Sequence, residues 1–350
     1  MKVAITGASG FLGSHCVAKA VEKGHLVRVL VRDPEKTTAA LEMHGIKKDL
    51  VEIVYADLAD ERSLDSGLEG VDTLLHTAAI FSLSPLDAKS MISINPSSTK
   101  TLLTSAVKHE LKQTVYVSTM GVFAPISGGD INENTETSTG LGPYTKSKIE
   151  SEKIARDFQH GGAPVNIVYP GGIFGPKDPN PNLSDSMGML TEILKRNLGL
   201  TASSAKLAMV DVRDVADVCV GALEVESKNA RYHAWGELVT MDQVIDLVKK
   251  ITDRNIRFYS TPLFLLDAMG TFGEVFTLAT RIRLPFAKES MKMFTQNARV
   301  NGPGKIDQSR ANTDFGFQNI SLEESLRDAL LWLHQAGHLT DKQSGKLANI

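Results

Sequence analysis

The chain has 350 residues, of which 42% are hydrophobic and 23% are charged, proportions typical of an ordinary globular protein. Its net charge of −3 argues against nucleic acid and membranes as partners, because it provides neither a basic field nor a polybasic patch. We expect the two cysteines, Cys16 and Cys219, to be buried thiols, and no Cys or His spacing is typical of a metal site. No run approaches about 20 apolar residues, so no transmembrane helix is expected. The default location is then the reducing cytoplasm.

The first thirteen residues combine a strand, a glycine-rich turn and the start of a helix. Residues 2–6 are a short apolar run of β-formers, and Gly7, Gly10 and Gly13 follow at three-residue intervals. From Phe11 onward, apolar residues recur with a helical period. This order is typical of the first βαβ unit of a dinucleotide-binding domain. The glycines let the backbone approach a pyrophosphate, and the start of the helix favours that anion.

The spacing Thr6-Gly7-x-x-Gly10-x-x-Gly13 departs from the standard dinucleotide fingerprint and resembles the signature of the extended short-chain dehydrogenase/reductase family. The resemblance implies a doubly wound, Rossmann-type parallel sheet of the α/β class and a nicotinamide dinucleotide as cofactor. It also implies that residues of the turn contact this cofactor: Thr6, Gly7, Ser9, Gly10, Phe11, Leu12 and Gly13.

Strand and helix patterns alternate along the first half of the chain, which is typical of a parallel sheet with helices on both faces. After the opening unit, strands are expected at 26–31, 51–56, 72–77, 114–118 and 165–169. Helices are expected at 62–68, 90–109, 144–159, 185–196, 212–223, 241–252 and 321–335.

Composition changes after Pro170, where a loop rich in glycine and proline begins. We therefore expect a dinucleotide-binding domain from residues 1–174 plus about 205–235. A smaller, mostly helical substrate lobe is expected from about 175–204 plus 236–338. Residues 339–350 are polar and are expected to form a flexible tail.

Arg32 directly follows the second expected strand, whose end faces the adenosine ribose in dinucleotide folds. A guanidinium there can grip the 2′-phosphate of NADP(H), whereas an acid would select NAD. Arg32 thus favours NADP(H), with Lys36 as a second phosphate contact. Alternatively, both are solvated loop charges, and the neighbouring Asp33 could turn inward and favour NAD.

Two short strings, residues 31–34 and 56–58, resemble dihydroflavonol-reductase-like members of the family. That resemblance implies that Asp57 and Leu58 border the adenine. It also places Thr77, Ala78 and Ala79 beside the nicotinamide ribose, although small residues would equally suit a strand end packed under a helix. Asn95 resembles the asparagine that orders the active site of the family, and a buried structural amide explains it equally well.

Tyr144 and Lys148 are four residues apart in an expected helix, so their side chains share one face. An ammonium beside a phenol stabilises the phenolate and lowers the pKa of the tyrosine. Tyr144 would then serve as a general acid in carbonyl reduction or a base in alcohol oxidation, and Lys148 could also hold the nicotinamide ribose. This pair matches the second motif of the resembled family.

The fifth expected strand ends in Ser118 and Thr119. The resemblance implies that one of these hydroxyls donates a hydrogen bond to the substrate oxygen. Alignment of the following Val-Phe pair favours Thr119, with Ser118, on the other face of the strand, as the alternative. Met120 and Gly121 stand where the sugar-nucleotide dehydratases of the family carry an Asp-Glu pair, so dehydratase chemistry is not expected.

The loop after the sixth expected strand resembles the family segment near the nicotinamide, which implies cofactor contacts from Tyr169, Gly171 and Ile173. The family often has Arg in place of Tyr169, which weakens a sugar-nucleotide interpretation. Four apolar residues near strand ends favour an apolar or aromatic substrate, unless they only form core: Phe81, Met120, Phe123 and Phe174.

These features favour an NADP(H)-dependent oxidoreductase that interconverts a ketone or aldehyde with an alcohol on a small apolar or aromatic substrate. A nucleotide-sugar epimerase with tightly bound NAD is the second hypothesis. A non-catalytic, NADP-binding redox sensor is the third, although such a sensor needs neither the Tyr-Lys pair nor Thr119. The resemblance also implies a homodimer through the Tyr144 helix.

Overall fold

The computed structural model describes residues 1–126, 128–202, 205–225, 229–284, 287–300 and 302–350. At its centre lies a parallel sheet of seven strands in the order β10-β6-β5-β4-β1-β2-β3. The strands are β1 (Lys2–Thr6), β2 (Leu26–Val31), β3 (Val51–Tyr55), β4 (Thr73–His76), β5 (Gln113–Val117), β6 (Val165–Pro170) and β10 (Arg231–Ala234). Both the expected fold class and the parallel pairing are confirmed.

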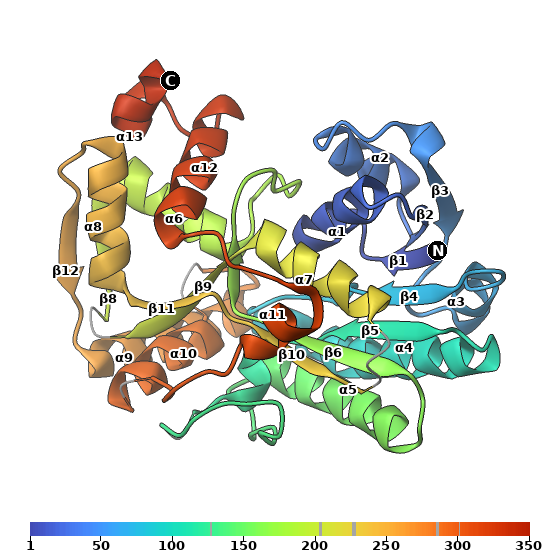
Figure 1. The fold of residues 1–350 in the computed structure, drawn as a ribbon. Helices are drawn as coiled ribbons and strands as arrows, with labels where there is room; N and C mark the ends of the chain where they lie inside the picture. Colours follow the sequence, from blue (N-terminus) through green and yellow to red (C-terminus); the bar gives the residue numbers. More distant parts are fainter. Residues whose placement is uncertain (127, 203–204, 226–228, 285–286, 301) are drawn as a thin grey trace.

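Helices cover both faces of this sheet (Figure 1). One face carries α1 (Phe11–Glu22), α2 (Pro34–Glu42) and α7 (Val212–Glu224), and the other carries α3 (Glu61–Gly67), α4 (Ala88–Lys108) and α5 (Pro143–His160). Valine-rich strands pack against α1 and α7 in a core that includes both cysteines as free, buried thiols. Covering helices on both faces explain why the strands are apolar along their whole length.

The strand order reverses between β1 and β4, which are neighbours in the sheet. In open α/β sheets, ligands bind at such a switch point, outside the carboxyl ends of the strands. The turn after β1, the segment after β4 and the start of α5 all belong to this edge. Three short 3₁₀ helices complete this part of the chain: η1 (Lys48–Leu50), η2 (Pro85–Asp87) and η3 (Met120–Phe123).

The second lobe contains more β-structure than expected. Two small sheets pair β11-β9-β7 and β12-β8. Their strands are β7 (Gly172–Phe174), β8 (Leu198–Thr201), β9 (Lys206–Asp211), β11 (Glu237–Thr240) and β12 (Arg257–Ser260). Runs of three to six residues are too short for a periodic signal, which is why the sequence did not reveal them. The helices are α6 (Asp185–Arg196), α8 (Met241–Thr252), α9 (Leu263–Thr280), α10 (Lys288–Arg299), α11 (Ser309–Phe315) and α12 (Leu322–Gln335).

The expectation of a flexible C-terminal tail is wrong. Helix α13 (Asp341–Ser344) and η4 (Gly345–Asn349) fold back onto α8 and α12. The side chains of Leu339 and Leu347 are buried in the core of the second lobe. The segment reads as polar, but these two leucines are sufficient to anchor it.

Helix α9 also departs from expectation. By length and composition it is long and apolar enough to cross a membrane, and it is the one such helix among the described residues. Most of it is exposed, so it is not the core helix of a globular domain. Its only two charged residues, Asp267 and Glu274, interrupt the apolar run, and a search for long uninterrupted runs therefore overlooks it.

Candidate active site

The turn after β1 has no room for side chains and is open to an anion. Gly7 has a φ of +77°, in the left-handed region that favours glycine. A Cβ atom on Gly13 would lie 2.0 Å from the carbonyl oxygen of Gly7, so α1 packs on the turn only with glycine there. Helix α1 begins after Gly10 with no capping side chain and no acidic residue in its first turn. Its amide groups and dipole are therefore available to a phosphate, and the turn fits the pyrophosphate of a dinucleotide.

The segment after β4 closes one side of this turn. Oγ1 of Thr6 is buried, lies 2.9 Å from Nδ1 of His76 and accepts the amide of Ala78. The hydroxyl of Thr77 donates to the carbonyl of Thr6 over 2.6 Å. The hydroxyl of Thr6 therefore joins two strand ends, and the predicted cofactor contact of Thr6 stays a prediction. Thr77, Ala78 and Ala79 are partly or fully exposed along this edge.

Five other predicted cofactor residues lie around the same edge, and they differ in which of their atoms are accessible. Ser9 is partly exposed in the turn. Phe11 is buried and Leu12 partly buried, and both pack into hydrophobic cores. Only their backbone amides are thus available at the helix start. Ile173 is partly exposed on β7, and Gly171 packs closely on Trp235, whose carbonyl oxygen would lie 2.6 Å from a Cβ there.

The end of β2 presents an exposed cation, Arg32, to the adenosine side of the crevice. The Arg32 side chain is largely exposed, with Nη1 4.0 Å from Oδ2 of Asp57. Asp33 caps helix α2 by accepting the amide of Lys36 over 2.9 Å, so its carboxylate is engaged in the cap. Lys36 is exposed, and Leu58 packs partly buried against the sheet edge. One oxygen of the Asp33 carboxylate is thus used by the helix cap.

Tyr144 lies in the first turn of α5, where three elements meet. Its ring meets the exposed ring of Phe81 edge to face, with centroids 4.7 Å apart and an interplanar angle of 82°. A hydrogen bond with the side chain of Thr119 lowers the pKa of the phenol, but burial outweighs this and raises the pKa to about 12. Tyr144 therefore keeps its proton at neutral pH and can donate it.

Lys148 shares the face of Tyr144 as predicted, but its expected electrostatic effect is wrong. The Nζ atom donates to the carbonyl of Val117 over 2.8 Å and lies 4.5 Å above the ring of Tyr116. Burial lowers the pKa of Lys148 to about 7, opposed by the carboxylate of Glu152. Lys148 is not among the groups that shift the pKa of Tyr144, which burial raises instead.

Ser118 and Tyr169 belong to a buried network around Glu152, which lies two helical turns further along α5 than Tyr144, so their hydroxyls are used within the protein and not at the Tyr144 site. The hydroxyl of Ser118 donates to Glu152 over 2.5 Å, and the phenol of Tyr169 donates to the same carboxylate over 2.7 Å. Arg156 forms an ion pair with Glu152 one helical turn away. Burial raises the pKa of the Tyr169 phenol far above its ordinary value. The hydroxyl that remains at the site is that of Thr119.

The four apolar residues predicted to bind substrate divide into two pairs. Phe81 is half exposed and its ring contacts that of Tyr144, whereas Met120 is partly exposed and packs against the cluster that contains Phe123. Phe123 is buried in an aromatic cluster beneath the strand ends, and Phe174 is buried in the core of the second lobe. The predictions for Phe123 and Phe174 are wrong, because η3 and β7 turn these rings inward.

Two further residues hold the site together. Asn95 is buried, accepts the amide of Ile80 and donates to its carbonyl and to Ser147 of α5. It thereby links the segment carrying Phe81 to the helix carrying Tyr144, which satisfies both proposed roles for this amide. Glu289, which the sequence did not reveal, accepts the amides of Tyr144 (3.1 Å) and Thr145 (2.8 Å) from helix α10.

Glu289 is buried and takes the place of an N-cap residue, although it lies 145 positions along the chain from Tyr144. A carboxylate at a helix start is stabilised by the free amides and the dipole. A Cβ on Gly142 would lie 2.5 Å from this carboxylate, so glycine is needed there. The signal for this contact was only indirect: Gly142 leaves α5 without a capping side chain of its own.

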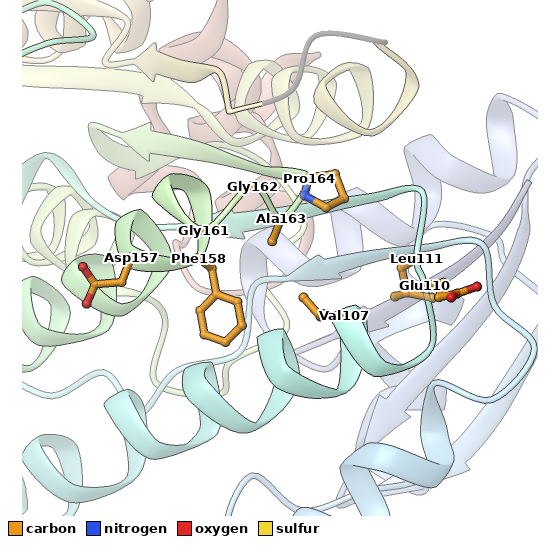
Figure 2. Close-up of a pocket in the computed structure, with 9 residues that line it drawn as sticks. All are labelled: Val107, Glu110, Leu111, Asp157, Phe158, Gly161, Gly162, Ala163 and Pro164. Carbon is orange, nitrogen blue, oxygen red and sulfur yellow. The ribbon is translucent and has the colours of Figure 1, made fainter.

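An apolar hollow of about 650 Å³ lies far from this chemistry (Figure 2). Val107 and Leu111 at the end of α4, and Phe158 at the end of α5, line it together with the residues that lead into β6. It therefore opens at the amino ends of the strands, whereas Tyr144 lies at the opposite end of α5. Ligands of open α/β sheets bind at the carboxyl edge, so we assign the site to the Tyr144 end.

The parallel sheet, the glycine turn at its switch point and the Tyr144–Lys148 helix define a dinucleotide-binding enzyme fold of the extended short-chain dehydrogenase/reductase type. A model of the NAD dependent epimerase/dehydratase family matches residues 3–235. The chain therefore belongs to this family, whose members bind a nicotinamide dinucleotide, and it is an NAD(P)-dependent oxidoreductase in that broad sense. The resemblance inferred from the motifs is confirmed.

Three curated relatives match nearly the whole chain. Sterol demethylase protein B of Methylococcus capsulatus is 27% identical, covering 96% of this chain and 99% of the relative. A putative dihydroflavonol 4-reductase of Synechocystis is 26% identical, with coverages of 96% and 95%. Cinnamoyl-CoA reductase 1 of Arabidopsis thaliana is 28% identical, with coverages of 96% and 90%.

Two solved structures show the same fold. The crystal structure of gox2253 superposes with a TM-score of 0.75 at 24% identity, covering 97% of this chain and 99% of that chain. UDP-glucuronic acid 4-epimerase from Bacillus cereus, in complex with NAD, gives a TM-score of 0.71 at 18% identity, with coverages of 96% and 100%.

Proposed function

We propose that this protein is an NADP(H)-dependent oxidoreductase that interconverts a ketone or aldehyde with an alcohol on a small apolar or aromatic substrate. The observation that carries the proposal is the environment of Tyr144. Its phenol is hydrogen-bonded to Thr119, its ring packs on the exposed ring of Phe81, and its pKa is raised to about 12. A protonated phenol at the carboxyl edge of the sheet is the group that a carbonyl reduction needs.

The roles of the residues follow from these contacts. When bound, the nicotinamide supplies or accepts the hydride. Tyr144 gives its proton to the carbonyl oxygen in reduction or takes it from the alcohol in oxidation. Thr119 orients the same oxygen through its hydroxyl. Lys148 is held under Tyr144 by the carbonyl of Val117, within reach of ribose hydroxyls along this edge.

Three charged side chains support the proposed preference for NADP(H). Arg32 is exposed at the end of β2, and Asp33 is engaged in the cap of α2. The exposed Lys36 provides a second cation nearby. A fork-shaped guanidinium suits a 2′-phosphate, and no free carboxylate at Asp33 opposes it.

An apolar substrate is supported by the exposed ring of Phe81, which packs on the ring of Tyr144. The names of the relatives point the same way. Dihydroflavonol 4-reductase and cinnamoyl-CoA reductase are named for reductions of aromatic compounds, and sterol demethylase protein B is named for the demethylation of an apolar one. We therefore place ketones and aldehydes on aromatic or polycyclic frames first among the candidate substrates.

A panel of such ketones and aldehydes, followed by the oxidation of NADPH at 340 nm, tests the proposal. We expect turnover with at least one apolar member and a KM for NADPH well below that for NADH. Replacing Arg32 with Ala should raise the KM for NADPH about 10-fold or more and leave that for NADH nearly unchanged, because only one cofactor carries the phosphate. Lys36→Ala is the matched control for a nearby surface cation. Equal effects on both cofactors would show that Arg32 does not read the phosphate.

Nucleotide-sugar epimerisation remains the second candidate, because a 4-epimerase that binds NAD has the same fold over nearly the whole chain. An epimerase needs no net oxidant and retains its dinucleotide. NAD that copurifies with the protein, together with interconversion of UDP-sugars without added cofactor, would replace the reductase proposal. Tight binding of NADPH with no turnover of any substrate would instead favour the redox sensor.

A further inference from the structure

Helix α9 presents an uncharged apolar stripe to the outside of the protein. Phe264, Phe272, Val275 and Leu278 are 75%, 61%, 61% and 50% exposed. Exposed positions recur at 264, 268, 272, 275 and 279, which follows the helical period and places them on one face. At 18 residues the helix is about 27 Å long. Soluble monomers seldom expose a continuous apolar strip of this kind without a partner.

The opposite side of α9 is firmly attached to the protein. Its two acidic residues both face α10, where Asp267 accepts Thr295 and Arg299, and Glu274 accepts Lys288. A Cβ on Gly270 would lie 2.9 Å from Met291, so the two helices touch closely. Leaving α10 would strip both carboxylates of their partners. Helix α9 is therefore built to lie along an apolar surface and not to cross a membrane.

The charge of the residues around α9 indicates what kind of surface the helix would lie on. Residues 257–299 contain six basic and three acidic residues, a net charge of +3, whereas the whole chain carries −3. Arg257 precedes the helix, and Arg281 and Arg283 follow it, all three exposed. Two copies of this segment would repel each other, which argues against self-association through it. Cations at the ends of an apolar stripe complement a layer of anionic headgroups over hydrocarbon.

We propose that α9 docks this protein on the surface of an anionic phospholipid bilayer. The apolar stripe enters the boundary between headgroups and acyl chains, and the flanking arginines stay at the level of the headgroups. This proposal goes beyond the enzymatic function and does not depend on it. It also replaces the expectation, drawn from the overall charge, that membranes are not partners.

Docking would bring the active site to the lipid. Arg283 forms an ion pair with Asp87 of η2 at 2.9 Å, and Asp87 accepts the hydroxyl of Ser82. Ser82 follows Phe81, whose ring covers Tyr144. The end of α9 is thus joined through three contacts to the segment over the candidate proton donor.

Co-sedimentation of the full chain with sucrose-loaded vesicles tests the proposal. The vesicles contain either phosphatidylcholine alone or phosphatidylcholine with 30% phosphatidylglycerol. We expect binding to the anionic vesicles, weaker binding to the neutral ones, and release by high salt. Replacing Phe264 and Phe272 together with Ser should weaken binding at least about 10-fold. Arg281→Gln should weaken it about 5-fold on anionic vesicles only.

Val107→Ser is the matched control, because this half-exposed apolar residue lies on α4, remote from α9. It should leave vesicle binding unchanged, and circular dichroism should show that every variant is folded. The proposal is overturned if the protein binds neither vesicle, or binds both equally. It is also overturned if the double Phe variant binds like wild type, or if light scattering shows a dimer that the double variant abolishes.

Discussion

Two neighbouring hydroxyl groups at the end of β5 face different surroundings. On the Glu152 side, two helical turns further along α5 than Tyr144, Ser118 and Tyr169 donate to a buried carboxylate that Arg156 also pairs with. On the Tyr144 side, at the start of the same helix, Tyr144 hydrogen-bonds with Thr119 beside the exposed ring of Phe81. One side is a closed network, and the other opens to the crevice.

The contrast separates structural tyrosines from reactive ones. Both phenols have a raised pKa, so the pKa alone does not distinguish Tyr144 from Tyr169. What differs is the partner: Tyr169 is committed to a carboxylate, whereas Tyr144 shares a hydrogen bond with a hydroxyl that can also bind a substrate oxygen. A fully satisfied buried network stabilises the fold, and an exposed, lightly bonded group is available for chemistry.

Replacing Tyr144 and Tyr169 separately with Phe tests the difference between the two tyrosines most directly. Tyr144→Phe should lower kcat about 1,000-fold, because the proton donor is lost, with the affinity for NADPH nearly unchanged. Tyr169→Phe should leave kcat within about twofold and instead lower the free energy of unfolding by roughly 1–3 kcal/mol. Steady-state kinetics and urea titrations measure both. Comparable kcat values in the two variants would contradict the assignment of roles.

Glu152→Gln should produce the largest loss of stability on the Glu152 side. The substitution removes the buried carboxylate of Arg156 and leaves it only the exposed one of Glu136, and loss of one partner costs about 3–5 kcal/mol in comparable buried pairs. Glu150→Gln, an exposed position on the same helix, is the matched control and should be neutral. Urea titration gives the unfolding free energies, and kcat per folded molecule should be retained. A stable, inactive Glu152→Gln variant would mean that this network takes part in catalysis.

Lys148 lies between Tyr144 and Glu152 on α5, and its titration makes the free energy of unfolding depend on pH. Its pKa is lowered from 10.5 to about 7 in the folded protein, so between these values the unfolded chain binds one more proton than the folded one. The Lys148 contribution therefore makes the free energy of unfolding rise as pH increases from 7 to 10.5, by up to about 1.4 kcal/mol per pH unit. Lys148→Met should remove this rise and stabilise the protein at pH 7, whereas the exposed control Lys146→Met should not. Parallel stability curves for wild type and Lys148→Met would refute the lowered pKa.

Replacing Glu289, which accepts amides at the start of α5, tests the Tyr144 side and has the smallest expected effect. Glu289→Ala removes the acceptor of the Tyr144 and Thr145 amides, so kcat should fall about 10-fold and the unfolding free energy by roughly 1–2 kcal/mol. Glu289→Gln retains an acceptor and should recover most of kcat. KM for NADPH should stay constant in both, since the contact positions Tyr144 and not the cofactor turn. A loss of stability without any change in kcat would make Glu289 a structural residue only.

Local patterns predicted individual helices well, even in the second lobe. The expected helices 185–196 and 241–252 coincide with α6 and α8, and the capping serine before α12 is where the sequence indicated. Each of these elements has strong periodicity or a cap within a few residues. The glycine turn was predictable for the same reason, because its requirement for space at Gly7 and Gly13 is local.

Features that depend on distant contacts were not predictable from the chain. Glu289 reaches Tyr144 from 145 residues away, and no local signal encodes that distance. Phe123 and Phe174 are apolar at strand ends like Phe81, and only packing decides which rings turn inward. The hydrophobicity of α9 is visible in the sequence, but its exposure follows from which side meets α10.

A crystal structure of the protein with NADPH measures the central claim most directly, namely that the glycine turn and Tyr144 serve one site. The account predicts the pyrophosphate over the turn between Gly7 and Gly13, the 2′-phosphate at Arg32, and the reactive nicotinamide carbon within about 5 Å of the Tyr144 hydroxyl, with space for a carbonyl group between them. A nicotinamide bound elsewhere, or separated from Tyr144 by protein side chains, would contradict it.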